Sequence, residues 1–356
     1  MHIAIDAREA AKSCRTGKGQ WAYGFWQELK KRNMTLTMCT GSHIQTICRL
    51  LTLKPDLYIS PTSYIVPALI GRWIPCAIIV HDLIAFRNEP HNVKAKWVER
   101  CTLKWALKYA KFVFTVSEAT KRDLLEKFPW VEPAKIKTIY AGHSQPSPSP
   151  FTSLRQGFGR QEGRGKQPYI LCVGTLCPRK NQLRLIEAFE SIQPSPQSSP
   201  FTSLRQGFGR QAGGGRLQLI LAGGRGWHDD KIVQKAKNTI GVTWLGHVAD
   251  DQYQELLEFA TLFALPSLYE GFGIAVLDAM QHGIPVLTSD RGSLQEIAGD
   301  AAIYVDPENI NSIAEGLERL LEDENLRNDL KEKGKQQAQR FIWKRTVDLF
   351  ARQVGL

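Results

Sequence analysis

The sequence has none of the features of a membrane-spanning, secreted or zinc-binding protein. Its apolar runs, such as residues 74–80, are far too short to cross a bilayer. The N-terminus has no basic segment followed by an apolar one, so we expect no secretory signal. The seven cysteines form no CxxC pair and have no histidine nearby in a metal-binding spacing. We therefore expect a reduced, cytoplasmic protein without a zinc site.

Two common phosphate-binding motifs are also missing from the 356 residues. No GxxxxGK[ST] segment occurs, which argues against a P-loop nucleotide hydrolase. An NAD-dependent oxidoreductase would need GxGxxG directly after a strand, with an acidic residue about 20 positions later. Neither the loop at Gly17 nor the segment 222–227 completes that pattern. The oxidoreductase is therefore kept as a distant alternative.

A strong net charge is also lacking once a repeated segment is set aside. The net charge is +11, but residues 146–167 and 194–216 carry three net positive charges each. Both tracts contain SPFTSLRQGFGRQ, within stretches rich in Pro, Ser, Gly and Gln. This composition is typical of loops, so we interpret the two copies, at 149–161 and 199–211, as an insertion duplicated at surface loops. An Arg/Gly arm for single-stranded nucleic acid is the alternative; because the positive charge belongs mostly to the repeats, we expect no nucleic-acid partner.

Outside these tracts, short apolar runs alternate with helical patterns. The runs are continuous in their apolar character, as expected of parallel strands buried on both faces. They lie at 2–7, 36–40, 56–60, 76–82, 112–117, 135–140, 169–174, 217–223, 242–246, 261–267, 285–290 and 301–307. We predict an α/β fold of two doubly wound, Rossmann-like domains.

The same pattern predicts the domain boundaries. We expect an N-terminal Rossmann-like domain at 1–145 and an insert or linker at 146–167. A C-terminal Rossmann-like domain then covers 168–340, interrupted by the insert at 194–216, and a final helix covers 341–356.

The segment LPSLYEGFGIAVLDAMQHGIPVLTSD, residues 265–290, is chemically the most informative. An apolar strand is followed by a Glu-Gly-Phe-Gly turn at 270–273 and then by a helix. Glycines allow a ligand to approach the backbone, and N–H groups at a helix start attract phosphate or sugar oxygens. Glu270 and Asp278 are then placed to accept hydrogen bonds from a sugar and a ribose. Alternatively, Asp278 is a solvated helix residue and Glu270 only stabilises the helix dipole.

This segment resembles the signature of the family-4 retaining glycosyltransferases of GT-B architecture, in which seven residues separate two acidic ones. Other stretches fall in the family's order and cover nearly all of the chain outside the repeats. They are IDAREAAKSCRTGKGQW, IIVHDLIAF, FTVSEATKRDL, YILCVGTLCPRKNQLRLIEAF, LILAGGRGWHDDKI, SLQEIAGDAAIYVDPENINSIAEGLERLLED and RFIWKRT. The resemblance implies an acceptor-side N-terminal domain facing a nucleotide-sugar-binding C-terminal domain across a cleft. It also implies that the C-terminal helix packs back on the N-terminal domain.

The resemblance implies donor-binding roles for several residues of the C-terminal half. Arg179 and Lys180 match the cationic pair that holds the donor diphosphate, where fixed cations offset the charge of a departing group; otherwise they form a solvated basic turn. Thr175 stands where some relatives have a phosphate-binding Arg, which leaves more of that task to the pair. Glu270 matches the acidic residue near the donor sugar. Asp278 matches the ribose-binding acid, usually Glu in the family, so we expect a weaker or water-mediated contact. The remaining donor-binding positions are Gly174, Gly271, Phe272 and Gly273.

In the N-terminal half the resemblance implies a loop that closes over the donor phosphates and the acceptor. Gly17 and Gly19 match that loop. Lys18 stands where relatives usually carry an apolar residue, so it either adds a phosphate contact or points to solvent. His81 matches a histidine at the sugar end of the cleft, although a lone histidine at a strand end is often only structural.

The resemblance therefore implies a retaining hexosyltransferase whose leaving phosphate helps to deprotonate the acceptor. The pattern looks closest to mannosyltransferases, so we expect GDP-mannose as the donor and a glycan or lipid-linked glycan as the acceptor. No cofactor or metal is expected, because no DxD triplet occurs and the cationic pair takes over charge stabilisation. The alternative is a catalytically degenerate nucleotide-sugar-binding protein, in which Asp278 and the two inserts have removed activity.

Residues 94–111 predict a helix with a basic stripe. Lys96, Arg100, Lys104 and Lys108 recur every four residues, with aromatic residues beside them. One interpretation is peripheral docking on the anionic inner face of a membrane that carries a lipid-linked acceptor. The other is a solvated helix face.

Overall fold

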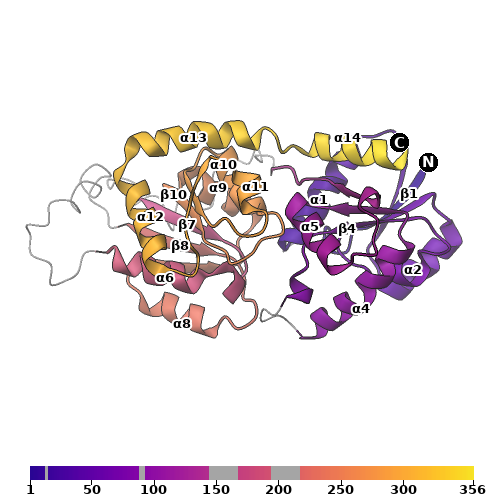
Figure 1. The fold of residues 1–356 in the computed structure, drawn as a ribbon, viewed down its shortest axis with the longest axis horizontal. Helices are drawn as coiled ribbons and strands as arrows, with labels where there is room; N and C mark the ends of the chain where they lie inside the picture. The colour runs from indigo at the N-terminus through magenta and orange to yellow at the C-terminus, as the bar shows by residue number, and fades with distance from the viewer. Residues whose placement is uncertain (13–14, 88–92, 144–166, 194–216) are drawn as a thin grey trace, which may run out of the picture. The chain divides into compact units, whose positions relative to one another are not determined.

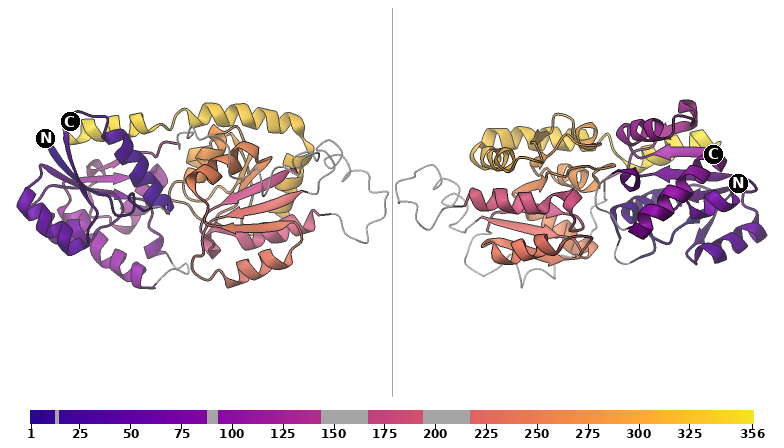
Figure 2. Two further views of the ribbon diagram at one scale, coloured as in Figure 1. Left: turned by 180° about the vertical axis from the view of Figure 1, so that it is seen from behind. Right: turned by 60° about the horizontal axis from the view of Figure 1, so that its bottom comes forward.

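The computed structural model describes residues 1–12, 15–87, 93–143, 167–193 and 217–356. Both copies of the repeat, at 149–161 and 199–211, lie outside the described residues, and with them the prediction of inserted loops. The chain forms two compact units, each built on a sheet with helices on both faces (Figure 1; Figure 2). The first unit contains residues 1–144, 270–274 and 341–356, and the second contains 145–269 and 275–340.

The first unit contains a six-stranded parallel sheet in the order β2-β1-β3-β4-β5-β6. Its strands are β1 (His2–Asp6), β2 (Thr35–Cys39), β3 (Leu57–Ser60), β4 (Cys76–Val80), β5 (Phe112–Thr115) and β6 (Ile136–Thr138). Its helices are α1 (Gly17–Leu29), α2 (His43–Leu53), α3 (Ile65–Ile70), η1 (Ile84–Phe86), α4 (Val93–Tyr109), α5 (Glu118–Lys127), η2 (Pro133–Lys135) and α14 (Trp343–Val354).

The second unit contains a six-stranded parallel sheet in the order β12-β11-β10-β7-β8-β9. Its strands are β7 (Tyr169–Val173), β8 (Gln218–Ala222), β9 (Val242–Gly246), β10 (Leu262–Leu265), β11 (Val286–Thr288) and β12 (Ala302–Tyr304). Its helices are η4 (Pro178–Lys180), α6 (Gln182–Ser191), α8 (Asp230–Asn238), α9 (Asp250–Phe259), α10 (Ile274–Gln281), α11 (Leu294–Ala298), α12 (Ile310–Glu322) and α13 (Glu324–Ala338).

All twelve apolar runs of the sequence form strands, so the predicted doubly wound α/β fold is confirmed. Every residue of β4 and of β10 is buried, which explains their continuous apolar sequence. In each sheet the strand order reverses once, between β1 and β3 in the first unit and between β7 and β10 in the second. Open parallel sheets bind ligands at such switch points, beyond the carboxyl ends of the strands. The fold therefore indicates where in each unit to look for a site.

Helix α14 completes the first unit by packing against α1. The Phe350 ring contacts Phe25 and Phe114, with both centroid distances at 5.1 Å. Trp343 occupies the space beside Gly24, where a methyl group would lie only 2.2 Å from its indole ring. The last segment of the chain is thus part of the core of the first unit.

The turn at 270–274 also clusters with the first unit, although the sequence pattern assigns it to the C-terminal domain, 168–340. Tyr140, Phe272 and Phe341 form an aromatic group in that unit, with neighbouring centroids 5.4–6.4 Å apart. Burial of these apolar rings stabilises the packing of the turn in the first unit.

Candidate functional site

The predicted cationic pair lies at the switch point of the second sheet. Arg179 and Lys180 belong to η4, which follows β7, and the loop after β10 lies against it. The Arg179 Nη1 atom donates to the Tyr269 carbonyl at 2.6 Å, and the Leu268 N–H donates to the Arg179 carbonyl at 2.8 Å. The guanidinium group therefore also fixes the loop that leads to Glu270.

Lys180 lies directly over Gly174, the residue that follows β7. A Cβ atom at Gly174 would lie 3.1 Å from Lys180 Cε and 3.5 Å from its Nζ. Gly174 has φ +147°, and its carbonyl oxygen would lie 2.1 Å from a Cβ atom at Gly223 (φ +153°), which follows β8. Only glycine fits this contact between the ends of two adjacent strands. The structure thus brings Gly174 and Lys180 together.

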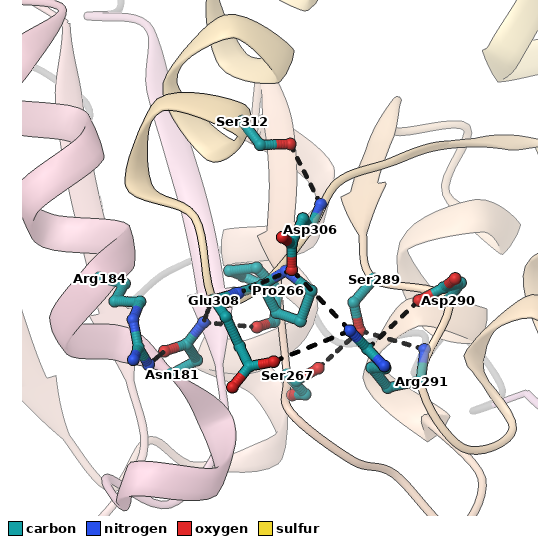
Figure 3. A network of polar contacts seen from close by, with 11 residues as sticks. Asn181, Arg184, Pro266, Ser267, Ser289, Asp290, Arg291, Asp306, Glu308 and Ser312 are labelled. Carbon is teal, nitrogen blue, oxygen red and sulfur yellow. Dashed lines mark hydrogen bonds and ion pairs between the residues drawn. The ribbon is translucent and has the colours of Figure 1, made fainter.

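Asn181 holds this cationic turn in place. It adopts a left-handed conformation with φ +60°, which asparagine tolerates better than most residues. Its buried Nδ2 atom donates to the carbonyls of Pro266 and Pro307 at 2.9 and 2.6 Å, while its Oδ1 accepts from Arg184 Nη1 at 3.0 Å (Figure 3). One amide therefore ties η4 to the loops that follow β10 and β12.

The loops around this turn are fixed by further polar contacts. Ser289 Oγ donates to the Ser267 carbonyl at 2.5 Å. Arg291 lies within 3.5–3.9 Å of the carboxylates of Asp290, Asp306 and Glu308 (Figure 3). The carboxyl edge of the second sheet is consequently a preorganised surface that carries Arg179 and Lys180.

Asp278, the predicted ribose-binding acid, lies buried on α10. Its Oδ2 atom accepts a hydrogen bond of 3.0 Å from the hydroxyl of Tyr253, on α9. Burial and the Asp278 carboxylate raise the pKa of Tyr253 well above its usual value, so the phenol stays protonated and donates. Asp278 is therefore an oriented carboxylate rather than a solvated helix residue.

Glu270 is buried in the first unit, and the turn after it packs on the end of β4. A Cβ atom at Gly271 would lie 1.9 Å from the His81 carbonyl oxygen, so no other residue fits without a shift of the backbone. The Gly271 carbonyl accepts hydrogen bonds from Ser117 Oγ at 2.7 Å and Thr120 Oγ1 at 3.2 Å. The structure thus joins Gly271 to His81, whereas the sequence treats them as separate motifs.

His81 is a neutral residue with a defined tautomer. Its Nε2 atom lies 2.6 Å from the Pro61 carbonyl, which can only accept, so Nε2 carries the proton and Nδ1 does not. Burial, with help from the charge of Lys18, lowers the pKa of His81 to about 4. Near neutral pH the ring therefore offers Nδ1 as a hydrogen-bond acceptor.

Gly17 and Gly19 form the first turn of α1. The helix is capped by Thr16, whose Oγ1 accepts from the Gly19 N–H at 3.3 Å. Lys18 in the same turn forms ion pairs instead of pointing to open solvent. Its Nζ atom lies 3.5 Å from Asp82 Oδ2 and 4.0 Å from Glu99 Oε2.

Sequence reasoning missed the residues that support the predicted site. Asn181, Tyr253, Ser117 and Thr120 each hold a predicted site residue or its backbone. A capping Ser-x-x-Thr pattern before a helix was the one available signal for Ser117 and Thr120. Within the described ranges, no group of three or more His, Cys, Asp or Glu side chains is arranged to hold a metal ion.

Two doubly wound parallel units of this kind make up the GT-B fold. The protein HepE of Anabaena, solved with UDP and glucose, has this fold, with a TM-score of 0.74 at 19% identity over 100% of this chain and 99% of that one. The chain belongs to the family of Glycosyl transferases group 1, whose model matches residues 158–337, and the model of Glycosyltransferase Family 4 matches residues 37–144. This membership overturns the oxidoreductase alternative.

The most similar curated proteins include mannosyltransferases. The O-antigen chain mannosyltransferase B of Escherichia coli is 29% identical over 298 residues, which cover 82% of this chain and 71% of that protein. The serotype-specific mannosyltransferase WbdA of E. coli is 23% identical over 257 residues, 68% of this chain. The match spans only 29% of WbdA.

Proposed function

We propose that this glycosyltransferase moves mannose from GDP-mannose to a glycan or lipid-linked glycan, with retention of configuration. The similarity to an O-antigen chain mannosyltransferase and to WbdA supports mannose as the sugar. The preorganised cationic turn at Arg179 and Lys180 is the observation that carries the choice of a diphosphate-activated donor.

Most of the predicted donor-binding residues have a stated role in this proposal. Lys180 binds the diphosphate and, with Arg179, offsets the charge that develops on the leaving nucleotide. Asp278, oriented by Tyr253, accepts from a ribose hydroxyl. Glu270 and the backbone of Gly271, Phe272 and Gly273 bind the donor sugar.

Metal independence is part of the proposal, because two fixed cations supply the charge that a divalent ion supplies elsewhere. Transfer should therefore continue unchanged after dialysis against EDTA. Loss of transfer that added Mg²⁺ or Mn²⁺ restores would contradict this point.

A thermal-shift panel is the first test of the donor. The purified protein is melted with GDP-mannose, UDP-glucose, UDP-N-acetylglucosamine, dTDP-rhamnose or NAD, since a ligand of the native state raises the melting temperature. We expect a rise with GDP-mannose, followed by mannose transfer to a lipid-linked or glycan acceptor. A rise with a different sugar nucleotide would identify that compound as the donor in place of GDP-mannose. Binding without transfer to any acceptor would favour a catalytically degenerate binding protein.

An exposed basic and aromatic face on α3 and α4 supports a membrane-borne acceptor. Arg72, just after α3, lies 5.7 Å from the Tyr109 ring centroid, Tyr109 stacks on Trp105, and Lys108 lies 5.4 Å from the Trp105 ring. Trp73 beside Arg72 is 70% exposed. Cations next to exposed tryptophans suit the interface of an anionic bilayer. No helix among the described residues combines the length and apolar character needed to cross a membrane.

The predicted stripe of four basic residues is divided in the structure. Lys96 Nζ and Arg100 Nε donate to the carbonyls of Arg87 and Ala85, at 2.8 and 2.6 Å. Lys104 and Lys108 lie on the exposed face of α4. We therefore assign membrane contact to the face formed by Arg72, Trp73, Lys104, Trp105 and Lys108.

Vesicle sedimentation tests this face. Trp73→Ala combined with Lys108→Ala should weaken binding to phosphatidylglycerol vesicles at least about ten-fold, since the lost cation alone contributes about 1 kcal/mol and the lost indole adds to this. Trp130→Ala is the control, because Trp130 is an exposed tryptophan like Trp73, at 50% against 70%, but follows α5. Equal binding by the double variant and the wild type would remove this face from the proposal.

A further inference from the structure

Lys18, the residue between the two glycines of the α1 turn, lies beside two carboxylates from different elements. Asp82 follows β4 and Glu99 belongs to α4, and the side chains of both are mostly buried, at 13% and 17% exposure. Lys18 itself is 35% exposed. The ammonium group therefore lies beside two carboxylates, although part of the side chain remains exposed.

The two carboxylates depend on this cation. Burial raises the pKa of Glu99, the charge of Lys18 opposes that rise, and the charge of Asp82 adds to it. Within the described part of the chain, Glu99 Oε1 is buried and has no hydrogen-bond partner. Without Lys18, two mostly buried like charges would lie side by side, which is costly. This pairing also disfavours a diphosphate as the partner of Lys18, because the carboxylates would repel it.

Asp82, one of the two partners of Lys18, also contacts the turn that follows Glu270. A Cβ atom at Gly271 would lie 2.9 Å from Asp82 Cβ, and the preceding residue, His81, accepts from Thr120 Oγ1 through its carbonyl at 3.2 Å. Asp82 Oδ1 further accepts from the Ile84 N–H at 3.2 Å, which fixes the strand end independently of Lys18. A single strand end thus contacts both Lys18 and the Glu270 turn.

We propose that Lys18 is a positioning residue that holds the Gly17–Gly19 turn in register with the Glu270–Gly273 turn through Asp82 and Glu99. Its effect on transfer reaches the nucleotide-sugar donor through those two turns, without contact between its ammonium group and the donor. The proposal rests on the proposed function only for the identity of the ligand that the two turns bind.

A double-mutant cycle between Lys18 and Glu99 tests the pairing. Lys18→Met and Glu99→Gln remove one charge each with little change of shape, and Lys18→Arg keeps the cation. Each neutral variant should lower kcat/KM about ten-fold, the double variant should be no worse than either, and Lys18→Arg should recover most of the activity. Lys12→Met is the matched control. Lys12 also forms an ion pair with a carboxylate, Glu9 at 2.5 Å, but this pair lies on the exposed surface and links residues of one turn.

Three results would overturn the proposal. A loss in Lys18→Met without a loss in Glu99→Gln would make Lys18 a direct ligand of the donor. Losses that multiply in the double variant would show that the two residues act independently. Unchanged kcat/KM in both single variants would make the pair irrelevant to transfer.

Amide hydrogen exchange without substrate separates this proposal from the proposed function. Lys18→Met should raise exchange in peptides covering 15–21 and 268–274 and leave β7 and β8 unchanged, with a melting temperature close to that of the wild type. Unchanged exchange in both peptides would refute the coupling, whichever donor the wild-type enzyme uses. A wild-type enzyme that transfers no sugar would instead refute the proposed function and leave the exchange result standing.

Discussion

The residues of the candidate site are of two kinds: those predicted to bind a ligand, and those that hold these residues in position through hydrogen bonds. Sequence alone predicted Lys180, Glu270 and Asp278 as ligand-binding residues, from the glycine-rich segments they lie in and from the family resemblance. It could not identify Asn181 or Tyr253, whose roles depend on carbonyl and carboxylate groups brought close only by the fold. Nothing in the local sequence of a buried tyrosine shows which distant acid it contacts.

Lys180→Ala should lower kcat/KM by about 100-fold or more, because it removes a preorganised cation that stabilises developing charge. Glu270→Ala should also abolish most transfer. The free energy of unfolding of the lysine variant should change by less than about 0.5 kcal/mol, since a half-buried lysine adds little to the core. Urea unfolding checks stability, and Lys231→Ala on the exposed face of α8 is the control. Full activity of both purified variants would refute the site assignment.

His81 makes stability depend on pH. Because burial lowers its pKa from 6.5 to about 4 in the folded state, the unfolded chain binds the proton more readily between these values. Its contribution is therefore complete above pH 6.5 and is lost as pH falls toward 4, by up to about 3 kcal/mol. Urea unfolding of wild type and His81→Asn across pH 4–7 measures this, and parallel curves for the two proteins would contradict it.

At the scale of elements, the sequence was most informative where burial is complete. Continuous apolar runs predicted all twelve strands, because both faces of a parallel sheet exclude polar residues. The basic stripe of α4 was less reliable: helical spacing placed four cations together, but η1 and the turn after it accept hydrogen bonds from two of them. Helical periodicity predicts which residues share a face of a helix, but it does not predict which other segments that face contacts.

Phe350→Ala on α14 should reduce the free energy of unfolding of the first unit by about 3–5 kcal/mol, through lost contacts and the cavity left behind. Phe350 is fully buried between Phe25 and Phe114. Leu349→Ala, at an exposed neighbouring position, should change it by no more than about 0.5 kcal/mol. Denaturant unfolding followed by tryptophan fluorescence gives both values, and similar small losses would place α14 outside the core.

For the whole molecule, the repeats set the limit of what sequence could predict. The second sheet begins with β7 after the first repeat and continues with β8 after the second, so deletion of 149–161 should leave transfer nearly unchanged. Deletion of 199–211 provides a comparison with the second copy. Loss of transfer with an unchanged melting temperature would show that the first copy contributes to activity.

The division of the chain into units also constrains chimeric enzymes. The turn at 270–274 and the helix α14 belong to the first unit, although both follow most of the second in sequence. A fusion of residues 1–144 to the rest of a homologue would therefore graft a foreign turn onto Ser117 and Thr120, and a foreign helix onto Gly24. Exchange of the whole second unit between relatives thus requires four crossover points, at 144/145, 269/270, 274/275 and 340/341, so recombination at a single junction would yield mismatched hybrids.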